Sequence, residues 1–189
     1  MENQLLTEQD ICNRVWMELG RATQDRHHEW RTPVLATVGN DGLPNARIVV
    51  LRHADAAQTR LQIYTDSRSP KISELTTQPT AVLVFWSKRL SWQLRVRVRV
   101  NMTVQMTGQE VDAVWERVSQ SAAAGDYLSL SAPGNALAGE PAAQVPGTGK
   151  HHHLAVLTAQ VQDIGWLELA RSGHRRALFG AGNWQWLVP

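Results

Sequence analysis

The alternation of apolar and polar residues predicts a chain made mainly of β-strands. The clearest strand lies within residues 91–107, where the apolar residues from Leu94 to Val100 alternate with Gln93 and three arginines. A period of two gives a strand one apolar face and one polar face. Shorter apolar runs bounded by turn residues predict further strands, at residues 33–38, 43–51, 61–65, 81–87, 154–161, 163–169, 175–179 and 184–188.

Helix signals are fewer. Thr7 is a candidate N-cap with Asp10 three residues later, and an apolar residue then recurs at every fourth position. Ser69 followed by Pro70 is typical of an N-cap and a first helical residue. The sequence therefore predicts helices over residues 7–21, 71–77 and 108–121.

These elements favour one domain over residues 1–189, with a helix and link at 1–32 and a flexible loop rich in Gly, Ala and Pro at 122–150. The fold class is mainly β with added helices. We expect an antiparallel β-barrel of six to eight strands, because short turns join most of the strands. A doubly wound fold is disfavoured, since no glycine-rich dinucleotide motif opens a helix.

Composition narrows the functional class only slightly. The 189 residues are 43% apolar and 19% charged, which is ordinary for a globular protein, and the net charge of +2 does not demand a nucleic-acid partner. No aromatic residues interleave the three arginines of residues 95–99, which disfavours nucleic-acid binding. The single cysteine allows no internal disulfide. There is no membrane-spanning run or signal-peptide pattern, so we expect a cytoplasmic protein.

Two segments carry candidate binding chemistry. Arg47 and Arg52 flank four branched apolar residues, which is the pattern of a strand covered on both faces. Residues 64–71 form a second run of hydroxyls and cations, in which Ser69 and Lys71 lie at the predicted start of a helix. Guanidinium groups and helix N-termini both suit phosphate, so the two segments could hold a phosphorylated cofactor. The alternative is that they are ordinary strands with polar ends. His151 to His153 make a poor chelate, because neighbours on a strand point to opposite faces, so no metal site is expected.

From about Pro33 to Pro189, the order of segments resembles the pyridoxamine 5'-phosphate oxidase-like family of FMN-binding split barrels. Five pieces carry the resemblance. The first is Arg47-Ile48-Val49-Val50-Leu51-Arg52, which resembles the family's Arg-x-Val-Leu-Leu-Lys strand, and the second is Tyr64-Thr65, which resembles its Tyr-Thr pair. The third is Ser69-Pro70-Lys71, which resembles its Ser-Arg-Lys phosphate segment, the fourth is Gln93-Leu94-Arg95-Val96, which resembles its Gln-Val-Arg strand, and the fifth is the tail from Trp166 through His174 and Arg176 to Pro189, which resembles its C-terminal signature.

The resemblance implies a homodimer that holds two FMN molecules at the subunit interface. It implies a flavin environment of Arg47, Ile48, Val49, Val50, Tyr64, Thr65, Ser69, Lys71 and Gln93, with Trp166 and Arg176 contributed by the other subunit. It also places Arg52 near the substrate, where it would orient an anionic or carbonyl group. His174 is the candidate for proton handling, with a structural histidine as the alternative.

The departures from the family pattern are as informative as the matches. Pro70 replaces an arginine of the phosphate segment, and Arg68 is a candidate substitute. Ser131 and Ser172 stand where the family's oxidases have substrate-phosphate arginines, although Tyr127 matches the family's tyrosine. The sequence therefore predicts an FMN-dependent oxidoreductase on a small substrate, without the pyridoxamine phosphate pocket. The alternative is a non-catalytic module that binds or senses flavin or haem.

Overall fold

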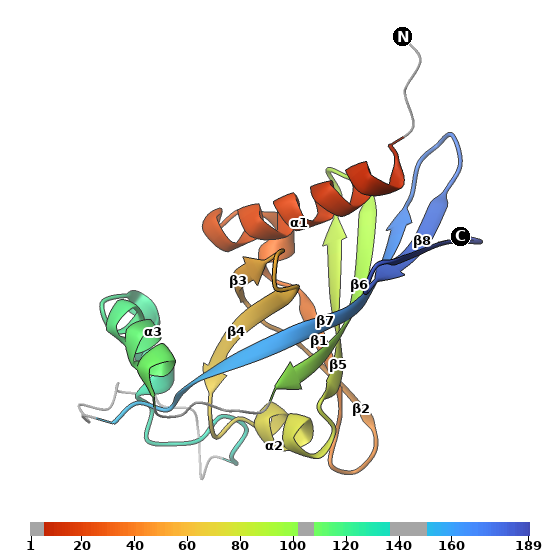
Figure 1. Ribbon diagram of the computed structural model, residues 1–189. Helices are drawn as coiled ribbons and strands as arrows, with labels where there is room; N and C mark the ends of the chain where they lie inside the picture. The colour runs from red at the N-terminus through yellow and green to blue at the C-terminus, as the bar shows by residue number, and fades with distance from the viewer. Residues whose placement is uncertain (1–5, 102–107, 137–150) are drawn as a thin grey trace.

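The strands of the computed structural model form a single antiparallel sheet (Figure 1). The structure describes residues 6–101, 108–136 and 151–189. The strands of this part of the chain are β1 (Val34–Val38), β2 (Pro44–Ile48), β3 (Leu51–Asp55), β4 (Arg60–Asp66), β5 (Thr80–Ser87), β6 (Trp92–Asn101), β7 (Leu154–Glu168), β8 (Arg175–Gly180) and β9 (Asn183–Leu187).

The order of the strands requires the sheet to close on itself. Hydrogen-bonded neighbours follow the order β2-β1-β5-β6-β7-β4-β3, and the hairpin β8–β9 pairs with β7 beyond the end of β4. β2 and β3 therefore lie at opposite edges, yet only Val49 and Val50 separate them in sequence. The sheet has to curl until its edges meet, which makes a barrel. The predicted mainly-β antiparallel barrel is confirmed, with the β8–β9 hairpin as an addition to the seven strands of the closed path.

The prediction of one continuous strand over residues 43–51 is wrong. Ile48 is 70% exposed, whereas Leu51 is fully buried, so the apolar run is not covered on both faces. Val49 donates its backbone N–H to the carbonyl of Pro33 at 3.0 Å, and the chain then crosses to the other edge of the sheet. The chain then forms β3, which continues as far as Asp55. Branched residues that bridge two strands look, in sequence, like one long strand.

The opposite correction applies to β7, which unites two predicted strands. Arg97 of β6 lies opposite Asp163, and Val98 lies opposite Val161, so Gln162 is an extra residue in β7. Such a β-bulge bends the strand without ending it. β7 can therefore pair with β4 over its first half and with β8 over its second half.

Helices lie at the two ends and at one side of the barrel (Figure 1). They are α1 (Glu8–Gln24), α2 (Pro70–Thr77) and α3 (Gln109–Ser119), with the short 3-10 helices η1 (Glu29–Arg31) and η2 (Ala122–Tyr127). The capping box predicted at the start of α1 is confirmed, because Thr7 and Asp10 exchange hydrogen bonds. No helix in these described ranges is long and apolar enough to cross a membrane. Residues 102–107 of a predicted strand and 137–150 of the predicted loop lie outside the described residues.

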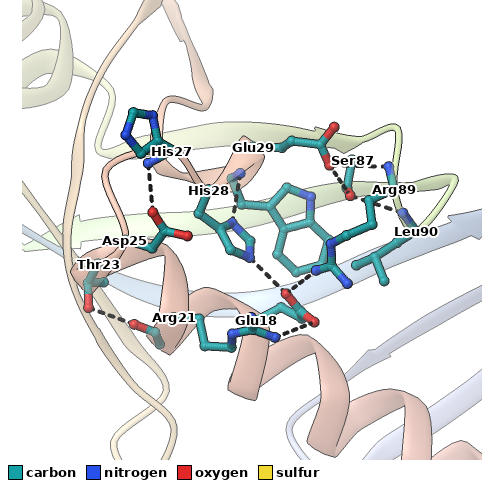
Figure 2. Close-up of polar contacts among 12 residues, drawn as sticks. Glu18, Arg21, Thr23, Asp25, His27, His28, Glu29, Ser87, Arg89 and Leu90 are labelled. Atoms are coloured by element: carbon teal, nitrogen blue, oxygen red, sulfur yellow. Dashed lines mark hydrogen bonds and ion pairs between the residues drawn. The ribbon is translucent and has the colours of Figure 1, made fainter.

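A buried carboxylate ties α1 to the rest of the barrel (Figure 2). The Oε2 atom of Glu18 accepts hydrogen bonds from His28 Nε2 at 2.7 Å and from Arg89 Nη2 at 2.6 Å. The Nδ1 atom of His28 accepts the N–H of Trp30 at 3.1 Å, so the proton of this imidazole lies on Nε2. Burial raises the pKa of Glu18, but the hydrogen bonds from His28 and Arg89 outweigh it and leave this pKa below its ordinary value.

Replacement of this carboxylate should destabilise the fold. We expect Glu18→Ala to lower the free energy of unfolding by about 2 to 4 kcal/mol, because His28 and Arg89 lose their common acceptor. Urea denaturation measures the loss, and the exposed Glu116 offers a matched control in Glu116→Ala. Since the folded-state pKa is lowered, the contribution of Glu18 is present above the ordinary glutamate pKa of 4.5 and disappears as the pH falls through the lowered value. A difference between wild type and variant that persists undiminished in acid would contradict this account.

Candidate functional site

Three polar side chains converge at the start of α2. Ser69 is the extended N-cap residue and Pro70 the first helical residue, as the sequence predicts. The hydroxyl of Ser69 does not cap the helix and instead accepts a hydrogen bond from Lys71 Nζ. The same ammonium donates to Thr65 Oγ1 at 2.9 Å. Two hydroxyls and a cation therefore lie together beside a helix N-terminus, which is an arrangement that suits an anion.

The charge of Lys71 is held in an unfavourable environment. Burial lowers the pKa of Lys71, and the nearby guanidinium of Arg47 lowers it further, while Glu74 and Asp66 oppose the shift. A second positive charge close to a partly desolvated ammonium is costly unless an anion joins the two. We call the group of Arg47, Thr65, Ser69 and Lys71 the phosphate cradle.

A buried acid fixes the arginine of the phosphate cradle. Arg47 Nη2 lies 2.7 Å from Glu74 Oε2, and its other terminal nitrogen donates to the hydroxyl of Thr37. Glu74 also accepts from Thr37 at 2.6 Å and from Asn45 Nδ2 at 2.8 Å. Burial raises the pKa of Glu74, but the hydrogen bonds from Thr37 and Arg47 lower it overall. Sequence reasoning missed Glu74, whose one signal is its position three residues after Lys71 on the same face of a short helix.

Arg68, the candidate substitute for the arginine that Pro70 removes, is paired with acceptors of its own chain. Its Nη2 atom lies 2.7 Å from Asp66 Oδ2 and donates to the carbonyl of Ser129 at 2.9 Å. Nη1 reaches the carbonyl of Leu130 at 3.3 Å. These contacts engage the guanidinium within the chain, which disfavours the candidate substitution. Arg68 instead fastens the segment after η2 to the phosphate segment.

A second group of side chains lies on β3, β4 and η2. The Arg52 guanidinium lies over the ring of Tyr64, with its carbon 5.6 Å from the ring centroid. Burial raises the pKa of the Tyr127 phenol, and the positive charge of Arg52 opposes that rise. The Arg52 Nε atom is buried without a hydrogen-bond partner in the described ranges. An unsatisfied donor at such a place is available to a ligand acceptor.

Gln93 and Arg176 share the outer face of the sheet. Gln93 pairs with Leu167, and Leu167 pairs with Arg176, so the three side chains lie in one row across β6, β7 and β8. Arg47 instead pairs with the buried Leu35 and points to the inner side. Within one chain, the phosphate cradle and the row of Gln93 and Arg176 therefore lie on opposite faces of the sheet.

The predicted flavin contact of Trp166 is contradicted by its burial. Trp166 has no accessible surface, and its ring packs edgewise on Trp92 with centroids 5.3 Å apart. Successive side chains on a strand point to opposite faces, and Leu167 points outward, so Trp166 must face the core. Of the apolar flavin candidates, Ile48 is exposed and Val50 half-buried, while the side chain of Val49 packs into the core.

The two predicted catalytic residues do not meet in one chain. His174 is exposed in the turn between β7 and β8, and none of the contacts among described residues joins it to Arg52. Figure 1 shows β8 at the far side of the barrel from β3 and β4. The two serines at the positions of family arginines, Ser131 and Ser172, are both exposed.

Comparison with known sequences identifies the segment that contains the phosphate cradle. Residues 13–104 match the family model described as pyridoxamine 5'-phosphate oxidase, FMN-binding domain. A pyridoxine/pyridoxamine 5'-phosphate oxidase of Myxococcus xanthus is 37% identical over 97 residues, which are 51% of this chain and 45% of that protein. The chain thus aligns with about half the length of such relatives.

Solved structures show the same fold over nearly the whole chain. A pyridoxamine 5'-phosphate oxidase-related FMN-binding protein of Nostoc punctiforme superposes with a TM-score of 0.67 at 20% identity, covering 98% of this chain and all of that one. A Burkholderia lata protein, solved with tetrahydrophenazine-1-carboxylic acid, also gives 0.67, at 16% identity, covering 99% of this chain and 95% of its own. At these identities the likeness establishes the fold.

Loss of the Arg68 contacts should release the segment that follows η2. We expect Arg68→Ala to speed amide hydrogen exchange in peptides covering residues 128–136 by about tenfold, the effect of losing roughly 1.4 kcal/mol of local protection. Mass spectrometry measures the exchange, and Arg171→Ala changes an exposed arginine as a control. Unchanged exchange in these peptides would show that Arg68 does not hold the segment.

Proposed function

The chain belongs to the pyridoxamine 5'-phosphate oxidase FMN-binding family through residues 13–104, and from that premise we propose that it is an FMN-dependent oxidoreductase acting on a small substrate. The observation that carries the proposal is the phosphate cradle. Lys71 donates hydrogen bonds to the hydroxyls of Ser69 and Thr65, and Arg47 is close enough to lower the pKa of Lys71.

The residues present fit the cofactor of the family. A phosphate dianion takes charge-assisted hydrogen bonds from an ammonium and a guanidinium, and Lys71 and Arg47 supply both. Lys71 donates hydrogen bonds to two hydroxyls, which can rotate to donate to a bound oxyanion. When bound, FMN supplies transfer of a hydride or of electrons. The protein's part is to bind the phosphate, orient the ring and hold the substrate.

We further propose a homodimer in which a second copy completes each flavin site. Gln93 and Arg176 face away from the phosphate cradle of their own chain, so one flavin can meet both groups only if they come from different chains. The outer face also exposes large apolar side chains: Val34 is 36%, Trp86 46% and Ile48 70% accessible. Apolar surface of this kind marks an association surface. In such a dimer, His174 of one copy is the candidate to handle a proton opposite Arg52 of the other.

The substrate side of the site favours a ligand without a phosphate dianion. Arg52 has an unused Nε donor and lies beside the buried Tyr127, so these two residues would orient a carbonyl or a single carboxylate. Ser131 and Ser172 bring no charge where the family's oxidases have arginines. We infer a substrate outside the phosphorylated vitamin B6 compounds.

The phosphate cradle yields a binding test with a defined pH dependence. We expect Lys71→Ala to weaken FMN binding about tenfold or more, through loss of one charge-assisted hydrogen bond. Because the pKa of Lys71 is lowered, the free protein loses this charge as the pH rises toward the ordinary value of 10.5, and FMN affinity falls over the same range. Lys71→Arg keeps its charge and should remove this decline.

Flavin fluorescence titration measures these affinities. Lys88→Ala removes an exposed lysine on the β5–β6 turn as the matched control. A decline with pH that survives in Lys71→Arg would remove Lys71 from the flavin site.

The missing arginines yield a test of substrate class. We expect FMN-loaded protein to produce no pyridoxal 5'-phosphate from pyridoxine 5'-phosphate under oxygen, since the pocket lacks the charge to hold a second phosphate. Efficient turnover would overturn the inference on substrate. A nicotinamide donor that bleaches bound flavin at a useful rate would support an oxidoreductase. Tight FMN binding with no bleaching by any donor would favour the non-catalytic alternative.

A further inference from the structure

A cavity of about 610 Å³ lies at the outer side of β4, β6 and β7, away from the phosphate cradle. Ligand pockets for small molecules have volumes of this order. The strands stand side by side in the order β6-β7-β4 (Figure 1). The pairing of these strands places the residues that line the cavity. Gln160 of β7 lies opposite Arg60 of β4 on one side and opposite Arg99 of β6 on the other. The two arginines therefore flank one glutamine on the same face.

The cavity is positively charged. Arg60 and Arg99 line it, and the side chains that line it among the described residues include no carboxylate. Arg60 meets Asp55 only at 3.7 Å, and its Nε atom is buried without a hydrogen-bond partner in this part of the chain. Arg99, in the described ranges, has no ion pair, whereas its neighbour Arg97 is paired with Asp163. The Cα atoms of residues two strands apart are about 10 Å from each other. At that spacing the two arginine side chains can both reach one small anion.

The uncharged groups of the cavity indicate what the anion carries. The Gln160 amide nitrogen donates to Gln58 O at 3.0 Å and to Thr59 Oγ1 at 2.6 Å, so the amide oxygen is left as an acceptor. The hydroxyl of Thr76 donates to Ile72 O at 2.8 Å, which also leaves its oxygen as an acceptor. These acceptors match ligand hydroxyl groups rather than a bare oxyanion.

We propose that this cavity binds a small hydroxylated organic anion, with its phosphate or carboxylate group between Arg60 and Arg99. The guanidinium fork accepts both kinds of oxyanion, and the Gln160 oxygen takes a ligand hydroxyl. The cavity is separate from the flavin site. Arg60 lies at the opposite end of β4 from Thr65 and Asp66, Arg99 lies on β6, and neither arginine belongs to the phosphate cradle.

Calorimetric titration of the FMN-saturated protein tests the proposal with ribose 5-phosphate and citrate as the two probes. We expect saturable binding of at least one probe, and which one binds decides between phosphate and carboxylate. Arg99→Gln should weaken that binding at least tenfold. Arg95→Gln changes an exposed arginine of the same strand and the same face that does not line the cavity, and it should leave binding unchanged.

A second variant keeps the proposal testable if Arg99→Gln fails to fold. Gln162→Glu places a carboxylate at the exposed rim of the cavity and should weaken binding by repulsion. FMN affinity should be unaltered in Arg99→Gln, which separates this site from the flavin site whether or not the proposed oxidoreductase activity holds. The proposal is overturned if neither probe binds, if Arg95→Gln weakens binding as much as Arg99→Gln, or if Arg99→Gln weakens FMN binding equally.

Discussion

Closure of the barrel through two residues is the constraint from which the rest of the structure follows. β2 and β3 occupy opposite edges of the sheet, and only Val49 and Val50 connect them. The connection delivers Arg47 to the inner side near α2 and Arg52 to the ring of Tyr64 on β4. Two arginines five positions apart thereby serve two separate groups, one suited to a phosphate and one to a substrate.

Buried carboxylates position several polar side chains of the molecule. Glu74 fixes Arg47 beside the phosphate cradle, and Glu18 holds His28 and Arg89 where α1 meets the β5–β6 turn. A buried charge is tolerated only when hydrogen bonds satisfy it, and both acids meet that condition. In both places the acid lies on a helix, so the helices of this small barrel orient side chains as well as cover its ends.

Local patterns predicted the elements well and the long-range contacts poorly. The period of two in β6, the capping box at Thr7 and the Ser69–Pro70 helix start depend on neighbours in sequence, so they could be read directly. The break after Ile48 follows from which strands pair, and the burial of Trp166 from which face of β7 meets the core. The partners of Arg68 and Arg47 come from segments about 60 and 27 residues away. Neither composition nor periodicity indicates contacts between residues so far apart in sequence. The family resemblance assigned roles to residues by position and carried no information on the direction in which their side chains point.

The pairing of β4 with β7 sets the order in which the barrel can assemble. Arg60 lies opposite Gln160, and the chain between them contributes α2, β5, β6 and α3 to the same domain. Contacts between residues so far apart in sequence slow folding, because the entropy of closing the loop is lost before the contacts form. That entropy grows only logarithmically, by about 0.6 kcal/mol for each doubling of loop length. A change in the length of the chain between β4 and β7 therefore costs the folded state little in loop-closure entropy.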